Sequence, residues 1–70
     1  MANTYTAVMK RDGAWWIGWI EEVPGVNCQE RTREKLLVSL RTTLAEALDL
    51  NRQEAIQAAA SNYSEELVTI

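Results

Sequence analysis

The carboxylates are the residues of this chain whose chemistry is easiest to judge from their spacing. Glu21 and Glu22 are adjacent, so on a strand their side chains point to opposite faces and cannot act together as general acid and base. Four further acids have a spacing that supports no metal-binding cluster: Asp12, Glu46, Asp49 and Glu66. We therefore predict solvated surface carboxylates, no metal site and no catalytic residue.

Other groups that often carry catalysis or hold cofactors are sparse. The chain has one cysteine, Cys28, and no histidine, so neither a zinc-finger ligand set nor an activated thiolate is predicted. We expect Cys28 to be a small buried side chain. Gly13, Gly18 and Gly25 are separated by five and seven positions and form no phosphate-binding loop. No cofactor is predicted.

The charge balance favours a basic protein over a nucleic acid as the partner. Seven Lys and Arg against ten Asp and Glu give a net charge of -3, whereas a duplex-binding domain gains most of its affinity from cations that contact phosphates. One local basic cluster, Arg31, Arg33 and Lys35 with Arg41 further along, flanks the start of a predicted helix, where the helix dipole disfavours cations. We interpret it as a solvated face and predict no direct DNA binding.

The alternation of side chains predicts three strands that would position these residues. Residues 3–10 alternate between two faces. Asp12-Gly13 then favours a hairpin turn, because such a turn needs positive φ angles. Residues 14–23 predict a second strand, which Pro24-Gly25 ends. A third, short strand follows over residues 26–30.

A helix and a final strand are predicted next. Thr32 is suited to cap the helix, and an apolar stripe has helical spacing: Leu36, Leu37, Leu40, Leu44, Ala47 and Leu48. We predict one helix to about Ala60. A break near Leu50 is the alternative, because residues 51–54 also resemble a capping box. Residues 65–70 predict a fourth strand.

The resulting order, β-β-β-α-β, predicts a single α+β domain over residues 1–70, a two-layer sandwich with the helix packed on one face of the sheet. Seventy residues bury only about 60% of the surface of the unfolded chain, so the core is marginal. One cysteine cannot form an internal disulfide. Association with another chain is the remaining way to add stability.

Both faces of the second predicted strand are apolar. One face carries Trp15, Ile17 and Trp19, and the other carries Trp16, Gly18 and Ile20. A two-layer domain buries only one face of its sheet, and large exposed apolar patches mark interfaces. We therefore expect a homodimer or a higher homo-oligomer.

The longest apolar run, residues 14–20, has seven residues, whereas a membrane-spanning helix needs about 20. A lone free thiol suits a reducing compartment. We predict no membrane association and a cytoplasmic location.

Over roughly its whole length the chain resembles the HicB-type antitoxins. The resemblance rests on Tyr5-Thr6-Ala7-Val8, Asp12-Gly13, the tryptophan-rich strand, Glu22-x-Pro24-Gly25-x-x-x-Gln29 and Thr32 before an amphipathic helix. It implies a partial ribonuclease-H-like fold and a binding module that neutralises a small basic HicA-type, mRNA-cleaving toxin by occluding its active site. The match is to a short form without the C-terminal DNA-binding domain of other members.

We predict a binding protein and not an enzyme. The residues expected to contact a partner, whether a second copy or a toxin, are Trp15, Trp16, Trp19, Glu21, Glu22, Pro24 and Gly25. The alternative is an orphan self-associating scaffold or small regulatory domain without a toxin. A nuclease is disfavoured, because ribonuclease-H chemistry needs several carboxylates around two metal ions.

Overall fold

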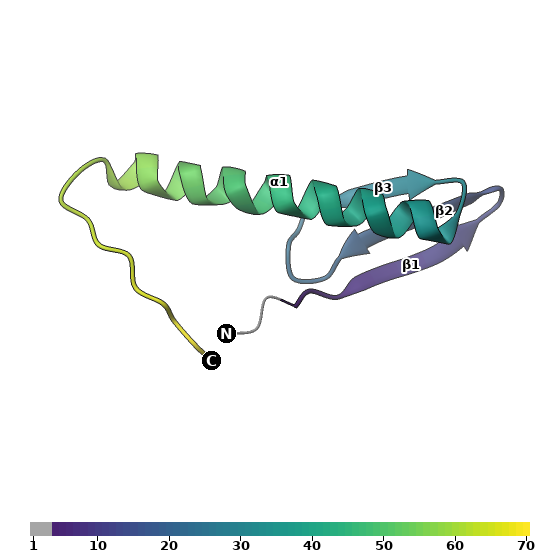
Figure 1. The fold of residues 1–70 in the computed structure, drawn as a ribbon, viewed down its shortest axis with the longest axis horizontal. Coiled ribbons are helices and arrows are strands. Elements are labelled where there is room, and N and C mark those ends of the chain that lie inside the picture. The colour runs from purple at the N-terminus through teal and green to yellow at the C-terminus, as the bar shows by residue number, and fades with distance from the viewer. Residues whose placement is uncertain (1–3) are drawn as a thin grey trace.

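The computed structural model describes residues 4–70 and shows a three-stranded antiparallel sheet followed by one long helix (Figure 1). The elements are β1 (Ala7–Asp12), β2 (Trp15–Ile20), β3 (Asn27–Glu30) and α1 (Arg33–Ala59). The predicted α+β class is confirmed. The first predicted strand included Asn3, which lies outside the described residues, and the strand itself begins at Ala7.

Two turns join the strands in the order β1-β2-β3. Gly13 has a φ of +62° in the tight turn between β1 and β2, as the Asp12-Gly13 pair predicts. The register pairs Met9 with Gly18 and Ala7 with Ile20. On the other side of β2, Gly18 pairs with Cys28 of β3. The three strands therefore form one continuous meander with β2 in the centre.

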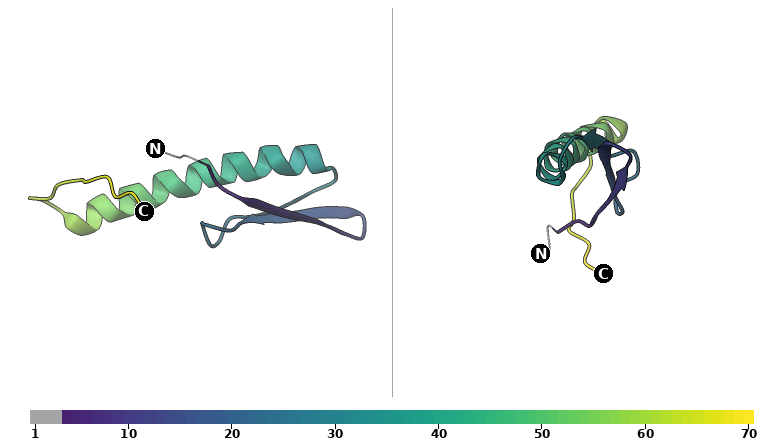
Figure 2. Two further views of the ribbon diagram at one scale, coloured as in Figure 1. Left: turned by 90° about the horizontal axis from the view of Figure 1, so that it is seen from below. Right: turned by 90° about the vertical axis from the view of Figure 1, so that its right-hand side faces the viewer.

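The helix is capped as predicted and is unbroken. The Thr32 hydroxyl accepts a hydrogen bond from the Lys35 backbone N–H at 3.1 Å. α1 then continues through Leu50 for 27 residues, so the alternative with a break at that point is wrong. Its length of about 40 Å, at about 1.5 Å per residue, is roughly twice that of the six-residue strands. Figure 2 shows its second half extending beyond the sheet.

The core lies where the first half of α1 crosses the sheet. Four side chains are buried there: Ile20, Val26, Leu36 and Leu40. Around them pack Ala7, Met9, Trp16, Val23, Cys28, Leu44 and Ala47. The predicted leucine stripe therefore faces the sheet at Leu36, Leu40 and Leu44, while Leu37 is 38% exposed at its margin.

The predicted fourth strand is wrong. Residues 60–70 contain no strand and are exposed throughout. Ala60 and Asn62 have positive φ angles, and here the chain turns back and then runs obliquely away from α1 (Figure 1). There the Arg52 guanidinium lies 3.8 Å from the carboxylate of Glu65. The physical reason is the length of α1. Because the helix ends beyond the sheet, residues 60–70 start at a distance from the strand edge with which they would have to pair.

Within residues 4–70, no helix is both long and apolar enough to cross a membrane.

Candidate protein-binding surface

The face of the sheet turned away from α1, here called the outer face, carries two of the three tryptophans predicted to contact a partner. Its centre is Trp15, Ile17 and Trp19 of β2, as the alternation predicts. On the β1 side the register places Val8 beside Trp19 and Lys10 beside Ile17. On the β3 side, Asn27 lies beside Trp19 and Gln29 beside Ile17. Val8 thus extends the apolar centre on one flank, and Lys10, Asn27 and Gln29 form a polar border.

The central side chains of the outer face are accessible to solvent. Trp19 is 37% exposed, and Trp15 and Ile17 are half-buried. The Arg31 guanidinium lies over the Trp15 ring, 4.0 Å from its centroid, which is a cation–π contact. A large aromatic in the middle with a polar or cationic border is the usual composition of a protein interface.

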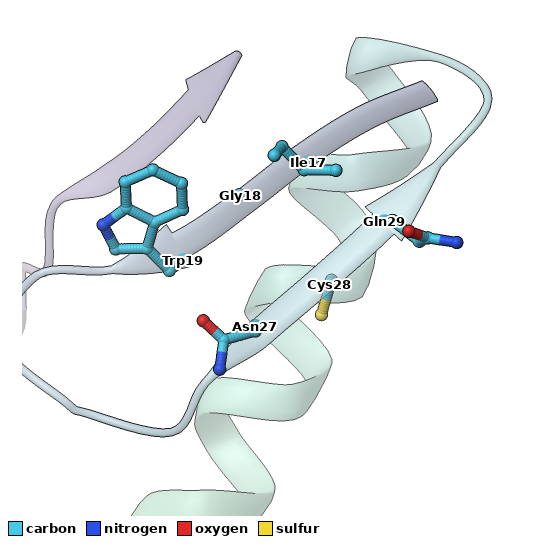
Figure 3. Close-up of a pocket in the computed structure, with 6 residues that line it drawn as sticks. All are labelled: Ile17, Gly18, Trp19, Asn27, Cys28 and Gln29. Carbon is cyan, nitrogen blue, oxygen red and sulfur yellow. The ribbon is translucent and has the colours of Figure 1, made fainter. Parts of the chain in front are cut away.

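A shallow hollow of about 330 Å³ opens between β2 and β3 (Figure 3). Six residues line it: Ile17, Gly18, Trp19, Asn27, Cys28 and Gln29. Its walls combine the apolar side chains of β2 with the amide groups of Asn27 and Gln29 on β3. Such a hollow can receive an apolar side chain of a partner while the amides hydrogen-bond to the partner's backbone.

Trp16 is separated from the other two tryptophans by the strand itself. It packs against the core on the helix-facing side, where the Arg11 guanidinium lies 5.7 Å from its ring centroid. The predicted contact set therefore divides: Trp15 and Trp19 share the outer face, while Trp16 supports the core.

The predicted loop residues Glu21, Glu22, Pro24 and Gly25 lie together in the exposed connection between β2 and β3. The loop is fastened to the segment before β1. The Thr6 backbone N–H donates to the Glu22 carboxylate at 2.7 Å, and the Glu21 backbone N–H donates to the Thr6 carbonyl at 2.9 Å.

The hydrogen bond from the Thr6 N–H favours the charged form of Glu22 and lowers the pKa of its carboxyl. Glu22 is therefore ionised at neutral pH. The loop begins directly after Ile20, the last residue of β2, so this negative charge lies near the Trp19 end of the strand, while Arg31 lies on Trp15 at the other end.

Reasoning from the sequence missed several border residues, Val8, Lys10, Asn27 and Gln29. Their signal was the same alternation that separates the tryptophans, once the pairing of the strands is known. Cys28, expected to be buried, is half-buried on the helix-facing side, with its Sγ 3.4 Å from the Thr43 hydroxyl. In residues 4–70 no group of three Asp, Glu, Cys or His side chains is placed to hold a metal ion.

Compared with protein-family models, curated proteins and solved structures, the chain matches none of them.

Proposed function

We propose that this chain is a protein-binding module of the antitoxin type, which neutralises a small basic, mRNA-cleaving toxin by covering the toxin's active site with the outer face. The proposal joins the resemblance to HicB-type antitoxins with one observation. The apolar centre of the outer face, with Trp19 at 37% exposure, has no covering layer among residues 4–70.

The chemistry of this face suits an apolar contact with a charged partner. Trp15, Ile17 and Trp19 supply rigid apolar area, and burying such area is the main source of contact energy in an interface. The hollow between β2 and β3 would bind one side chain of the partner at a defined position. Asn27 and Gln29 on its wall would fix the orientation of the partner through hydrogen bonds.

Charge would act mainly on the rate of association. The chain carries a net charge of -3, and Glu21 and Glu22 project from the loop beside Trp19. A basic ribonuclease carries cations around the site that holds RNA phosphates, so an acidic protein is drawn to that site. The module then blocks RNA by occupying the same surface, and needs no catalytic group of its own.

The test is to co-express the chain with the small basic protein encoded beside it, and to measure growth and affinity by calorimetry. The wild-type chain should restore growth and form a stable complex. Trp19→Ala should weaken the complex at least tenfold, because truncation of a central aromatic at an interface costs about 2 kcal/mol or more.

Leu50→Ala is the matched control, because Leu50 is also a large exposed apolar residue but lies on α1, away from the outer face. It should leave the affinity unchanged. Reversing Glu21 and Glu22 to Lys should slow association, most strongly at low salt. The proposal fails if no basic protein is encoded nearby, or if Trp19→Ala and Leu50→Ala bind alike.

A further inference from the structure

A second uncovered site lies on the other side of the sheet, at the edge formed by β1. Among residues 4–70, β1 pairs with β2 alone, so its other edge presents backbone groups without a strand partner. Where β1 begins, a groove of about 280 Å³ opens between the segment that leads into the strand and α1. Its apolar lining is Tyr5, Ala7, Ile20, Leu37, Leu40 and Leu44. For comparison, a cavity of about 150 Å³ holds a benzene ring, so the groove has room for aliphatic side chains.

The chain also contains a strand-like segment without a sheet. Residues 66–70, here called the tail segment, have the sequence Glu-Leu-Val-Thr-Ile, which is rich in β-branched and aliphatic residues. Leu67 is 83% exposed and Val68 is 81% exposed. An exposed run of this composition and an unpaired sheet edge are complementary surfaces.

Residues 63–65, which directly precede the tail segment, lie against the second half of α1, away from the groove of their own chain. Glu65 lies against Arg52, which follows the groove residue Leu44 by eight positions, or about 12 Å along the helix. Five extended residues span about 17 Å. With Glu65 at this position, the tail segment would use most of its length to return to its own groove and would have little left to run along it.

The direction of the chain is also unfavourable within one copy. A tail segment that returned from the far end of α1 would run in the same direction as β1 (Figure 1). In the register that aligns the tail segment with residues 7–11, parallel pairing would set Glu66 beside Ala7 and Ile70 beside Arg11, which opposes charged and apolar side chains. A second copy turned end for end presents its β1 in the opposite direction.

We propose that the tail segment of one copy adds as a fourth, antiparallel strand to the β1 edge of a second copy, and that the exchange is reciprocal. Antiparallel pairing sets Ile70 beside Ala7 and Val68 beside Met9, and it sets Glu66 beside Arg11. Ala7, Met9 and Arg11 all lie on the helix-facing side of β1. Ile70 then enters the groove beside Ala7, Val68 packs beside Met9 at the margin of the core, and the charges at the end of the pair attract.

This strand-exchanged dimer goes beyond the proposed antitoxin function, because it uses a different surface. It extends the sheet at β1 and covers the groove beside α1. The outer face around Trp19 stays free for another protein. Each copy gives its tail segment to the β1 edge of the other, so the same contact is made twice. The assembly therefore closes as a two-fold dimer.

Light scattering of the full chain at tens of micromolar tests the exchange. We expect about twice the monomer mass of 7.9 kDa. Val68→Lys should weaken dimerisation at least a hundredfold, because both copies lose an apolar contact. Glu66→Lys and Arg11→Glu should each weaken it severalfold, and the double variant should recover the affinity because it restores opposite charges. Circular dichroism checks that each variant keeps its helix.

Leu50→Lys is the matched control and should remain dimeric, because Leu50 lies outside the groove and the tail segment. A wild-type chain that is monomeric at these concentrations overturns the proposal. This includes a monomer in which hydrogen exchange shows protected amides in the tail segment, because the tail would then pair with the sheet of its own chain. A dimer that withstands Val68→Lys and Glu66→Lys also overturns it. So does a dimer that dissociates on Trp19→Lys, since the outer face would then be the contact.

Discussion

Gly18 allows α1 to lie close against the sheet. A Cβ atom at this position would be 2.9 Å from the Val8 carbonyl oxygen and 3.1 Å from methyl carbons of Leu36 and of Leu40. We expect Gly18→Ala to destabilise the fold by about 1–3 kcal/mol, because the added methyl group overpacks the core. Urea denaturation measures this change. Lys10→Ala, on the exposed part of β1, should change stability by at most about 0.5 kcal/mol; equal effects would show that α1 packs elsewhere.

Glu22 gives the fold a dependence on pH. Because the hydrogen bond from Thr6 lowers the pKa of the folded-state carboxyl, folding is favoured above the unfolded-state pKa of about 4.3. This contribution disappears as the pH falls through the lowered folded-state pKa. Urea midpoints measured between about pH 6 and 2.5 report how much stability is lost on acidification. This loss should be smaller in Glu22→Gln than in Glu21→Gln, because Glu21→Gln removes the same charge but keeps the hydrogen bond between Glu22 and Thr6. Identical pH profiles would contradict this role.

Alternation along the chain was sufficient to separate Trp15 and Trp19 from Trp16, which the structure confirms. It could not tell which side the helix covers, because both sides of β2 are apolar. That choice depends on Gly18, since only the side without a Cβ at the centre lets the leucines of α1 approach this closely. The packing of two elements decides it, and no local pattern contains that information.

At the scale of elements, α1 is held by a few leucines in its first half. Leu40 is only 1% exposed against the sheet. Leu40→Ala should cost about 2–5 kcal/mol, the range for a buried leucine, which is a large share of the stability of a small domain. Thermal or urea unfolding measures the loss, and Leu50→Ala, at a position that is 54% exposed, is the control. Comparable losses in the two variants would contradict this packing.

The elements also show where prediction from the sequence stops. The strands, the turn at Gly13 and the Thr32 cap depend on neighbouring residues, and each was predictable. The strand expected at residues 65–70 has suitable composition, but a strand needs an edge within reach. The length of α1 places this segment beyond its own sheet. β propensity depends on the residues of the segment alone and cannot predict how far it lies from a strand edge.

Considered as a whole, the molecule has a small core and two uncovered surfaces on opposite sides of one sheet. Four side chains are buried among residues 4–70, which is a modest core for a domain of this size. The outer face carries the proposed contact with a basic protein, and the groove beside β1 carries the proposed exchange with a second copy. Binding at either surface would stabilise the folded state by mass action.

The three tryptophans allow the most direct test of the central claim, that this chain binds another protein through the outer face. Each indole N–H gives its own NMR signal, and the signals can be followed while the proposed small basic partner is added. We predict that the signals of Trp15 and Trp19 shift or broaden as the complex forms, while that of Trp16, on the helix-facing side, stays in place. A complex that perturbs Trp16 but leaves Trp15 and Trp19 unchanged would contradict the account.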